Sequence, residues 1–232
     1  KLVAELMIVA NSTWGGLLAE KGVPAIYRAQ IRAVVSAAVT VSLRGLPVAP
    51  ELLIPLTAVG EEVRRVAEAV RAIAEEVFSE LGARVAFKVG TMIELPRACL
   101  VAGEMARHVD FFSFGTNDLT QTAFGISRDD STHFIPAYVD ELAVLPQNPF
   151  RTLDIVGVGE LITMAIDRGR AAHPALELGV CGAQGGESRS IQFFADHGVD
   201  YVSCALSRLV VARLAAAQAA GRLDPRKPKS AG

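Results

Sequence analysis

Short apolar segments of strand-forming residues alternate with helical segments along most of this chain, and this alternation limits the fold more than any other feature. The segments with strand character are 52–56, 84–95, 109–118, 176–182 and 199–206. Those with helical character are 27–41, 61–81, 96–108, 157–173, 188–198 and 208–220. Because the strands are apolar along nearly their whole length, we expect a parallel sheet covered on both faces. The sequence therefore predicts an α/β protein.

Two layouts fit about five strand–helix units. One is a partial (β/α)8 barrel that lacks its first strands, and the other is a doubly wound open sheet. Polar, functional-looking residues follow most of the predicted strands, which favours the barrel, because barrel enzymes place their sites at the carboxyl ends of the strands. The segment 125–150 has no regular pattern and is longer than most loops, so it is either functional or disordered.

Charge and cysteine content exclude several classes of protein. The net charge is −2 without a basic cluster, which argues against a nucleic-acid surface. The longest apolar runs fall well short of ~18 residues, so we expect no membrane span. The N-terminal segment contains Glu5 and lacks the basic start and cleavage site of a signal peptide. Three cysteines are an odd and sparse set, which predicts free thiols in a reducing cytoplasm.

Two carboxylates, Glu94 and Asp118, lie at the carboxyl ends of adjacent predicted strands. Carboxylate oxygens suit Mg²⁺, which is held by one or two carboxylates together with substrate oxygens and water. The alternative is that Asp118 caps the following helix, a common position for aspartate. Capping is less natural for Glu94, which lies just before Pro96, so the pair favours a metal site.

The turn Gly115–Thr116–Asn117 lies between these two carboxylates in the sequence. A glycine allows a ligand to approach the backbone, and exposed N–H groups with polar side chains bind anionic oxygens. Glycine and asparagine are also ordinary turn formers. Cys204, at a predicted strand end, is either a reactive thiol or a small buried residue, and Cys99 falls inside a helix and is expected in the core.

Three stretches carry a resemblance to a known family. They are "KVGTMIELPRACLVAGEMARHVDFFSFGTNDLTQTAFGISRDD", "GVGELITMAIDRGRAAHPALELGVCGAQGG" and "YVSCALSRLVVARLAAAQAA". In this order they resemble the C-terminal barrel of the pyruvate, phosphate dikinases, which binds phosphoenolpyruvate or pyruvate. The resemblance covers 31–220 and implies a Mg²⁺-dependent phosphotransferase domain that interconverts these two compounds.

The resemblance also implies roles for individual residues. Glu94 and Asp118 match Mg²⁺ ligands, and together with Gly115, Thr116 and Asn117 they match residues that line the substrate. Cys204 matches the thiol that exchanges a proton at C3 of the enolpyruvate. Cys181 is the second candidate, because a related sugar-transport phosphotransferase has a cysteine near this position.

Departures from the family pattern leave an alternative open. The chain has "SCALSR" and "CGAQGG" where the family usually has "SCSPFR" and "CGEHGG". The family's phosphohistidine and ATP-binding domains, and the first barrel strands with two substrate-binding arginines, have no counterpart in this sequence. We therefore expect either the C-terminal part of such an enzyme or a degenerate, non-catalytic binding or regulatory domain.

The two ends of the chain lie outside this resemblance. The segment 1–30 is predicted to be a divergent helical segment with a weak likeness to part of an RNB-type exoribonuclease domain, and 221–232 a disordered tail. Full-length members of the family are usually dimers through this barrel, so a homodimer is a further expectation. The phosphohistidine and ATP-binding domains of a full-length enzyme are the other expected partners.

Overall fold

The computed structural model describes residues 25–223, and these form two compact units. Of the described residues, the first unit contains 25–51 and 66–88, and the second contains 52–65 and 89–223. Two predicted segments lie largely outside the described residues: 1–24 of the segment 1–30, and 224–232 of the tail 221–232. No helix in the described range has the length and apolar character needed to cross a membrane.

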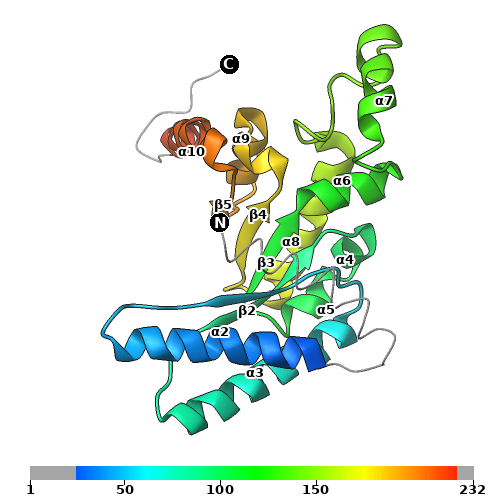
Figure 1. Cartoon of the computed structure of the whole chain (residues 1–232). Helices are drawn as coiled ribbons and strands as arrows, with labels where there is room; N and C mark the ends of the chain where they lie inside the picture. The colour runs from blue at the N-terminus through cyan, green and yellow to red at the C-terminus, as the bar shows by residue number, and fades with distance from the viewer. Residues whose placement is uncertain (1–24, 224–232) are drawn as a thin grey trace. The chain divides into compact units, whose positions relative to one another are not determined.

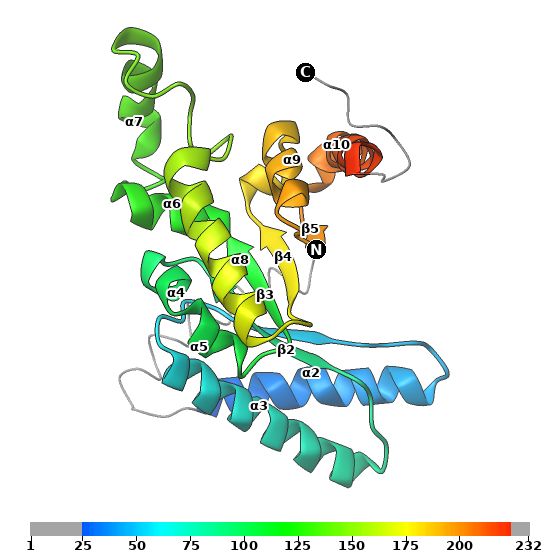
Figure 2. The ribbon, with the colours of Figure 1, turned by 180° about the vertical axis from the view of Figure 1, so that it is seen from behind.

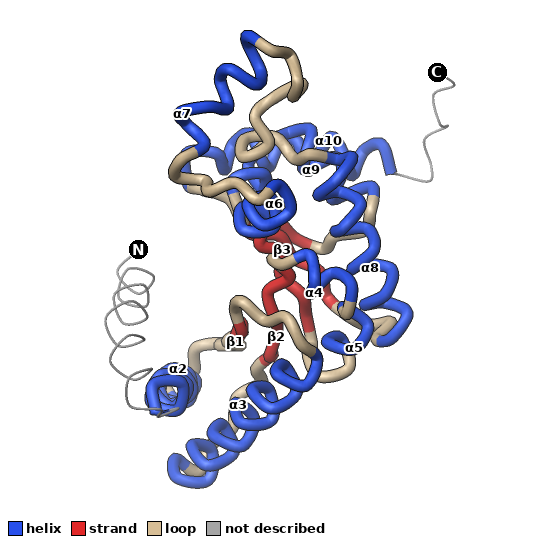
Figure 3. The backbone as a smooth tube through the Cα atoms, turned by 90° about the vertical axis from the view of Figure 1, so that its right-hand side faces the viewer, coloured by secondary structure: helices blue, strands red, loops and turns tan. Residues whose placement is uncertain are grey.

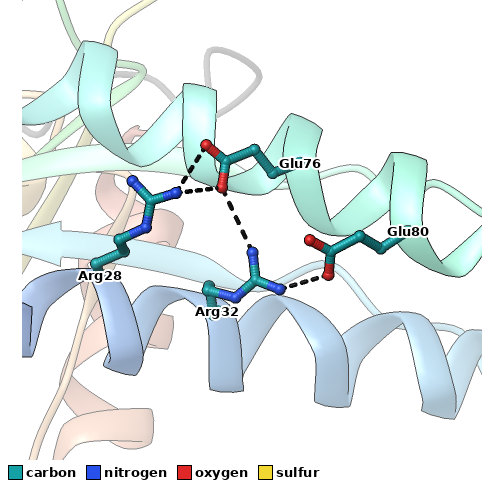
Figure 4. Close-up of polar contacts among 4 residues, drawn as sticks. All are labelled: Arg28, Arg32, Glu76 and Glu80. Carbon is teal, nitrogen blue, oxygen red and sulfur yellow. Dashed lines mark hydrogen bonds and ion pairs between the residues drawn. The ribbon is translucent and has the colours of Figure 1, made fainter.

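The first unit contains helix α2 (Ala25–Leu43) and most of helix α3 (Gly60–Leu81). Each helix buries an apolar stripe at helical spacing, as expected for an amphipathic helix. The buried residues are Val35 and Val39 in α2, and Val70, Ile73 and Val77 in α3. Arg28 and Arg32 of α2 form ion pairs with Glu76 and Glu80 of α3 (Figure 4).

The second unit is built on a parallel sheet in which the spatial order of the strands is their order along the chain. The strands are β1 (Glu51–Ile54), β2 (Lys88–Ile93), β3 (Phe111–Gly115), β4 (Glu177–Cys181) and β5 (Tyr201–Val202). The α/β prediction is confirmed. A strand order that never reverses is that of a barrel, because a doubly wound sheet changes direction at a switch point.

The helices of the second unit follow the strands (Figure 1). They are α4 (Pro96–Leu100), α5 (Ala102–Ala106), α6 (Thr116–Phe124), α7 (Ser131–Pro136), α8 (Glu160–Ala172), α9 (Ser188–Asp196) and α10 (Leu209–Leu223). Short turns of other helix types are η1 (Ala137–Glu141), η2 (Ile155–Gly159), η3 (Ala183–Gly186) and η4 (Leu206–Arg208).

Four sequence-based boundaries were wrong. The strand expected over 109–118 ends at Gly115, and the residues after it open α6, a helix that the sequence pattern did not predict. The helix expected over 96–108 is broken at Val101, whose φ of −109° and ψ of 16° are not helical. The segment 125–150, expected to be irregular, contains α7 and η1, whose short length and internal Pro136 hide the helical pattern. The strand expected over 199–206 extends only from Tyr201 to Val202.

Successive side chains of each strand point alternately to the two faces of the sheet. On one face Phe112, Phe114, Leu178 and Val180 join a buried cluster with residues of α5 and α8. Figures 2 and 3 show α4, α5 and α8 along this side of the strands. On the other face, glycines make room for aromatic rings: a Cβ at Gly90 would lie 2.4 Å from the Phe111 ring. The polar residues considered below lie at the carboxyl ends of β2, β3 and β4.

Candidate active site

Glu94 lies one residue beyond β2 and is almost completely buried, with 3% of its surface exposed. Its Oε1 accepts a hydrogen bond of 2.7 Å from the backbone N–H of Leu56. Leu56 has a positive φ of 53°, a strained conformation for a residue with a side chain. Burial raises the pKa of Glu94, the Leu56 N–H opposes this, and the negative charge of Asp118 raises the pKa further.

Asp118 lies in the first turn of α6, which follows β3 without any intervening loop. Asp118 is exposed, and its proximity raises the pKa of Glu94. Gly115 permits this proximity, because a Cβ there would lie 2.8 Å from Cβ and 2.9 Å from Oε2 of Glu94. The structure thus brings together the two carboxylates that the sequence predicted, one buried and one open to solvent.

Thr116 and Asn117 connect the end of β3 to the turn that follows β4. Thr116 is completely buried, and its hydroxyl lies 2.7 Å from Oε1 of Gln184. Asn117 is half-buried, and its Oδ1 accepts a hydrogen bond of 3.1 Å from the N–H of Ala183. Because Oδ1 is bonded in this way, the amide NH₂ of Asn117 is left as the donor that a ligand can use. The hydroxyl of Thr116, in contrast, is already bonded to Gln184.

The three cysteines have different surroundings. Cys181, at the end of β4, is half-buried, and its sulfur accepts a hydrogen bond of 3.4 Å from the Ser113 hydroxyl. Burial raises the pKa of the Cys181 thiol, and the charges of Glu94 and Asp118 add to this effect. The structure therefore places Cys181 near the carboxylate pair.

Cys204 lies two residues beyond β5, is half-buried, and packs against a small apolar cluster formed by Ile191, Ala212 and Ala215. Cys99 is fully buried in α4, as expected, and burial raises the pKa of its thiol to about 12. Of the two thiols considered for proton exchange, Cys181 is the one paired with Gly115 across β3 and β4, at the edge of the sheet where Glu94 and Asp118 lie.

Mg²⁺ fits the donor set at this position. Within residues 25–223 no group of three or more His, Cys, Asp or Glu side chains is arranged to hold a metal ion. Burial disfavours the charged form of the Glu94 carboxyl, and a neighbouring cation would compensate for this cost. Two neighbouring carboxylates suit a cation that takes its remaining ligands from substrate and water. The chemistry of the site agrees with a metal held jointly by protein and ligand.

Sequence reasoning missed three contributors to this site. Leu56, whose N–H fixes Glu94, is an ordinary strand-end residue with no sequence signal. Ser113 is a polar residue within an apolar strand, which is a usable signal because its side chain must find a partner. Gln184 was noted only as a departure from a family pattern.

Comparisons with known proteins agree with this geometry. Residues 16–221 match the family described as "PEP-utilising enzyme, PEP-binding domain". The chain is 50% identical over 195 residues to a chloroplastic pyruvate, phosphate dikinase of Mesembryanthemum crystallinum, covering 84% of this chain and 20% of that protein. It is 49% identical over 195 residues to a chloroplastic pyruvate, phosphate dikinase 1 of Arabidopsis thaliana, with the same coverage. The chain thus spans about a fifth of the length of these relatives.

A solved structure supports the fold. The chain aligns with a citrate lyase from Burkholderia xenovorans with a TM-score of 0.53 and 14% identity, over 83% of this chain and 54% of that one. At this identity the likeness concerns the fold alone. Together with the unreversed order of parallel strands, it identifies the second unit as part of a barrel.

Proposed function

Because this chain belongs to the PEP-binding domain family of the PEP-utilising enzymes, we propose that it binds phosphoenolpyruvate or pyruvate with Mg²⁺ at the carboxyl ends of β2, β3 and β4. We further propose that it serves as the C-terminal barrel of a pyruvate, phosphate dikinase-like phosphotransferase. The observation that carries the proposal is the placement of Glu94 and Asp118 just beyond the neighbouring parallel strands β2 and β3, with Glu94 packed against Gly115.

Glu94 and Asp118 would hold the metal ion. When bound, Mg²⁺ supplies positive charge that stabilises the oxygens of an enolate. The chain's own part is to hold Glu94 by the N–H of Leu56, to keep the backbone open at Gly115, and to present the amide NH₂ of Asn117 to an anionic oxygen. Thr116 supports this turn from its buried position.

A cysteine thiol would exchange the proton at C3. Toward pyruvate, the S–H bond breaks and a C–H bond forms with the electron pair of the enolate double bond, which leaves a thiolate. The family resemblance points to Cys204 for this role, and Cys181 is the alternative that lies near the carboxylates. Exchange of the pyruvate methyl protons with solvent separates them: Cys204→Ala should abolish exchange and Cys181→Ala should retain it. The reverse result would transfer the role to Cys181.

Titration calorimetry with oxalate, a mimic of the enolate, tests the site itself. The full chain should bind oxalate only with Mg²⁺, and Asp118→Ala should lose this binding. Asp129→Ala, which removes an exposed aspartate in the 125–150 segment, is the matched control and should bind like the unmodified chain. Absence of Mg²⁺-dependent binding in the unmodified chain would refute the proposal.

A non-catalytic binding domain is the second candidate. The packing of Cys204 against an apolar cluster favours it, because aliphatic neighbours disfavour the thiolate that proton exchange requires. Oxalate binding without any solvent exchange of pyruvate protons would identify this case.

The proposal extends to partners and location. Phosphohistidine and ATP-binding domains, as in full-length dikinases, would supply the phosphoryl group, and a homodimer in the cytoplasm is the expected setting.

A further inference from the structure

Gln184 is the one fully buried glutamine side chain in the described part of the chain, with 0% of its surface exposed. It lies in η3, the turn that follows β4, and both ends of its amide are bonded. Oε1 accepts the 2.7 Å hydrogen bond from the Thr116 hydroxyl, and Nε2 donates a 2.8 Å bond to the backbone carbonyl of Pro149. Because the carbonyl can only accept, the orientation of the amide is fixed.

These two bonds connect three separate segments. Thr116 opens α6, Gln184 follows β4, and Pro149 lies in the segment between η1 and η2. The bond from Ala183 to Asn117 connects the same two strand ends a second time. The turn that carries Asn117 and Asp118 is therefore held from the β4 side rather than by its own sequence.

The space around this contact is already filled. Gly182 approaches Thr116 so closely that a Cβ on it would lie 2.2 Å from Oγ1. The next nearest acceptor for the Thr116 hydroxyl is the Cys181 carbonyl, at 3.3 Å. Without Gln184, Thr116 could turn to that carbonyl, but the connection to Pro149 would be lost.

From this geometry we infer that Gln184 is a positioning residue: it fixes the β3–α6 turn so that Asn117 and Asp118 meet the ligand. The inference rests on the proposed function, and it assigns a role to a position where the sequence departs from the family pattern. Gln184 contacts neither carboxylate in this role and acts only through Thr116 and the turn.

The test compares Gln184→Leu with Ser190→Ala. Ser190 is a matched control because it is also buried, and its hydroxyl also connects two segments, bonding Leu153 N–H at 3.0 Å and Glu187 Oε2 at 2.6 Å. In calorimetry with oxalate and Mg²⁺, Gln184→Leu should weaken binding about 10- to 100-fold, as is usual for residues that orient a metal or ligand site. Ser190→Ala should lower the melting temperature without changing the oxalate affinity.

A conservative replacement and a ligand-free measurement complete the test. Gln184→His keeps one acceptor and one donor as neutral imidazole and should recover most of the affinity. Hydrogen exchange of the amides in 115–119 should be faster in Gln184→Leu than in Ser190→Ala. Unchanged oxalate affinity in Gln184→Leu, or an equal loss in Ser190→Ala, would overturn the inference. If the unmodified chain binds no oxalate, the proposed function fails, and unchanged exchange at 115–119 would then refute the role of Gln184 separately.

Discussion

Replacing Gly182 by alanine should damage the site more than any other single methyl group added to this edge of the sheet. Gly182 has φ of 136° and ψ of 172°, a region that is essentially restricted to glycine and costs other residues about 1–3 kcal/mol. The new Cβ would also lie 2.2 Å from Oγ1 of buried Thr116 and 3.3 Å from the backbone N of Asn117. Overfilling a packed position adds about 1–3 kcal/mol.

The two costs add to roughly 2–6 kcal/mol of unfolding free energy. For a chain of this size that corresponds to a fall in melting temperature of about 4–24 °C. Gly125→Ala is the matched control: its φ is 66°, but no atom lies within 4 Å of the added Cβ. That variant should lose only about 1–2 kcal/mol from backbone strain.

Differential scanning calorimetry measures both variants, and oxalate titration should show weakened binding for Gly182→Ala alone. If Gly182→Ala melts no lower than Gly125→Ala, the crowding against Thr116 is not real and the reasoning fails.

Three further predictions concern chemistry away from this turn. Cys99, with its pKa raised to about 12 by burial, should resist iodoacetamide in the native protein at pH 8, whereas half-buried Cys204 should be alkylated, as read by mass spectrometry. Labelling of Cys99 at the same rate would contradict its burial. Hydrogen bonds from Arg64 and Arg65 lower the pKa of Glu61 to about 2. The ion pairs of Glu61 with these two arginines should therefore persist above pH 4.5 and weaken as the pH falls toward 2. An NMR titration of the Glu61 carboxyl should show this, and a midpoint near 4.5 would refute it. Arg32→Ala should leave the midpoint of urea unfolding nearly unchanged, because its ion pairs are solvent-exposed. A clear fall in that midpoint would show that these pairs hold α2 and α3 together.

The adjacency of the two carboxylates could be predicted from sequence because parallel strands end at a common edge. Glu94 follows β2 and Asp118 follows β3, so their meeting requires only that the two strands are neighbours. The buried state of Glu94 could not be predicted in this way, since it depends on the backbone of Leu56, 38 residues earlier.

The role of Thr116 shows the corresponding limit. In sequence it is a polar residue in a turn, which suggests an exposed ligand. In the structure it is buried against Gln184, 68 residues later, because only the folded sheet brings the ends of β3 and β4 together. Local patterns also failed where helices are short, as at Val101 and in 125–150, since one turn of helix has too few residues to show a periodic pattern.

The unreversed strand order has a consequence for synthesis of the protein. Each strand from β2 to β5 pairs with the strand that precedes it along the chain, although the long segment 116–176 separates β3 from β4. The sheet can therefore grow in one direction as the polypeptide leaves the ribosome, and at every stage the newest strand is the unprotected edge that a chaperone would have to cover.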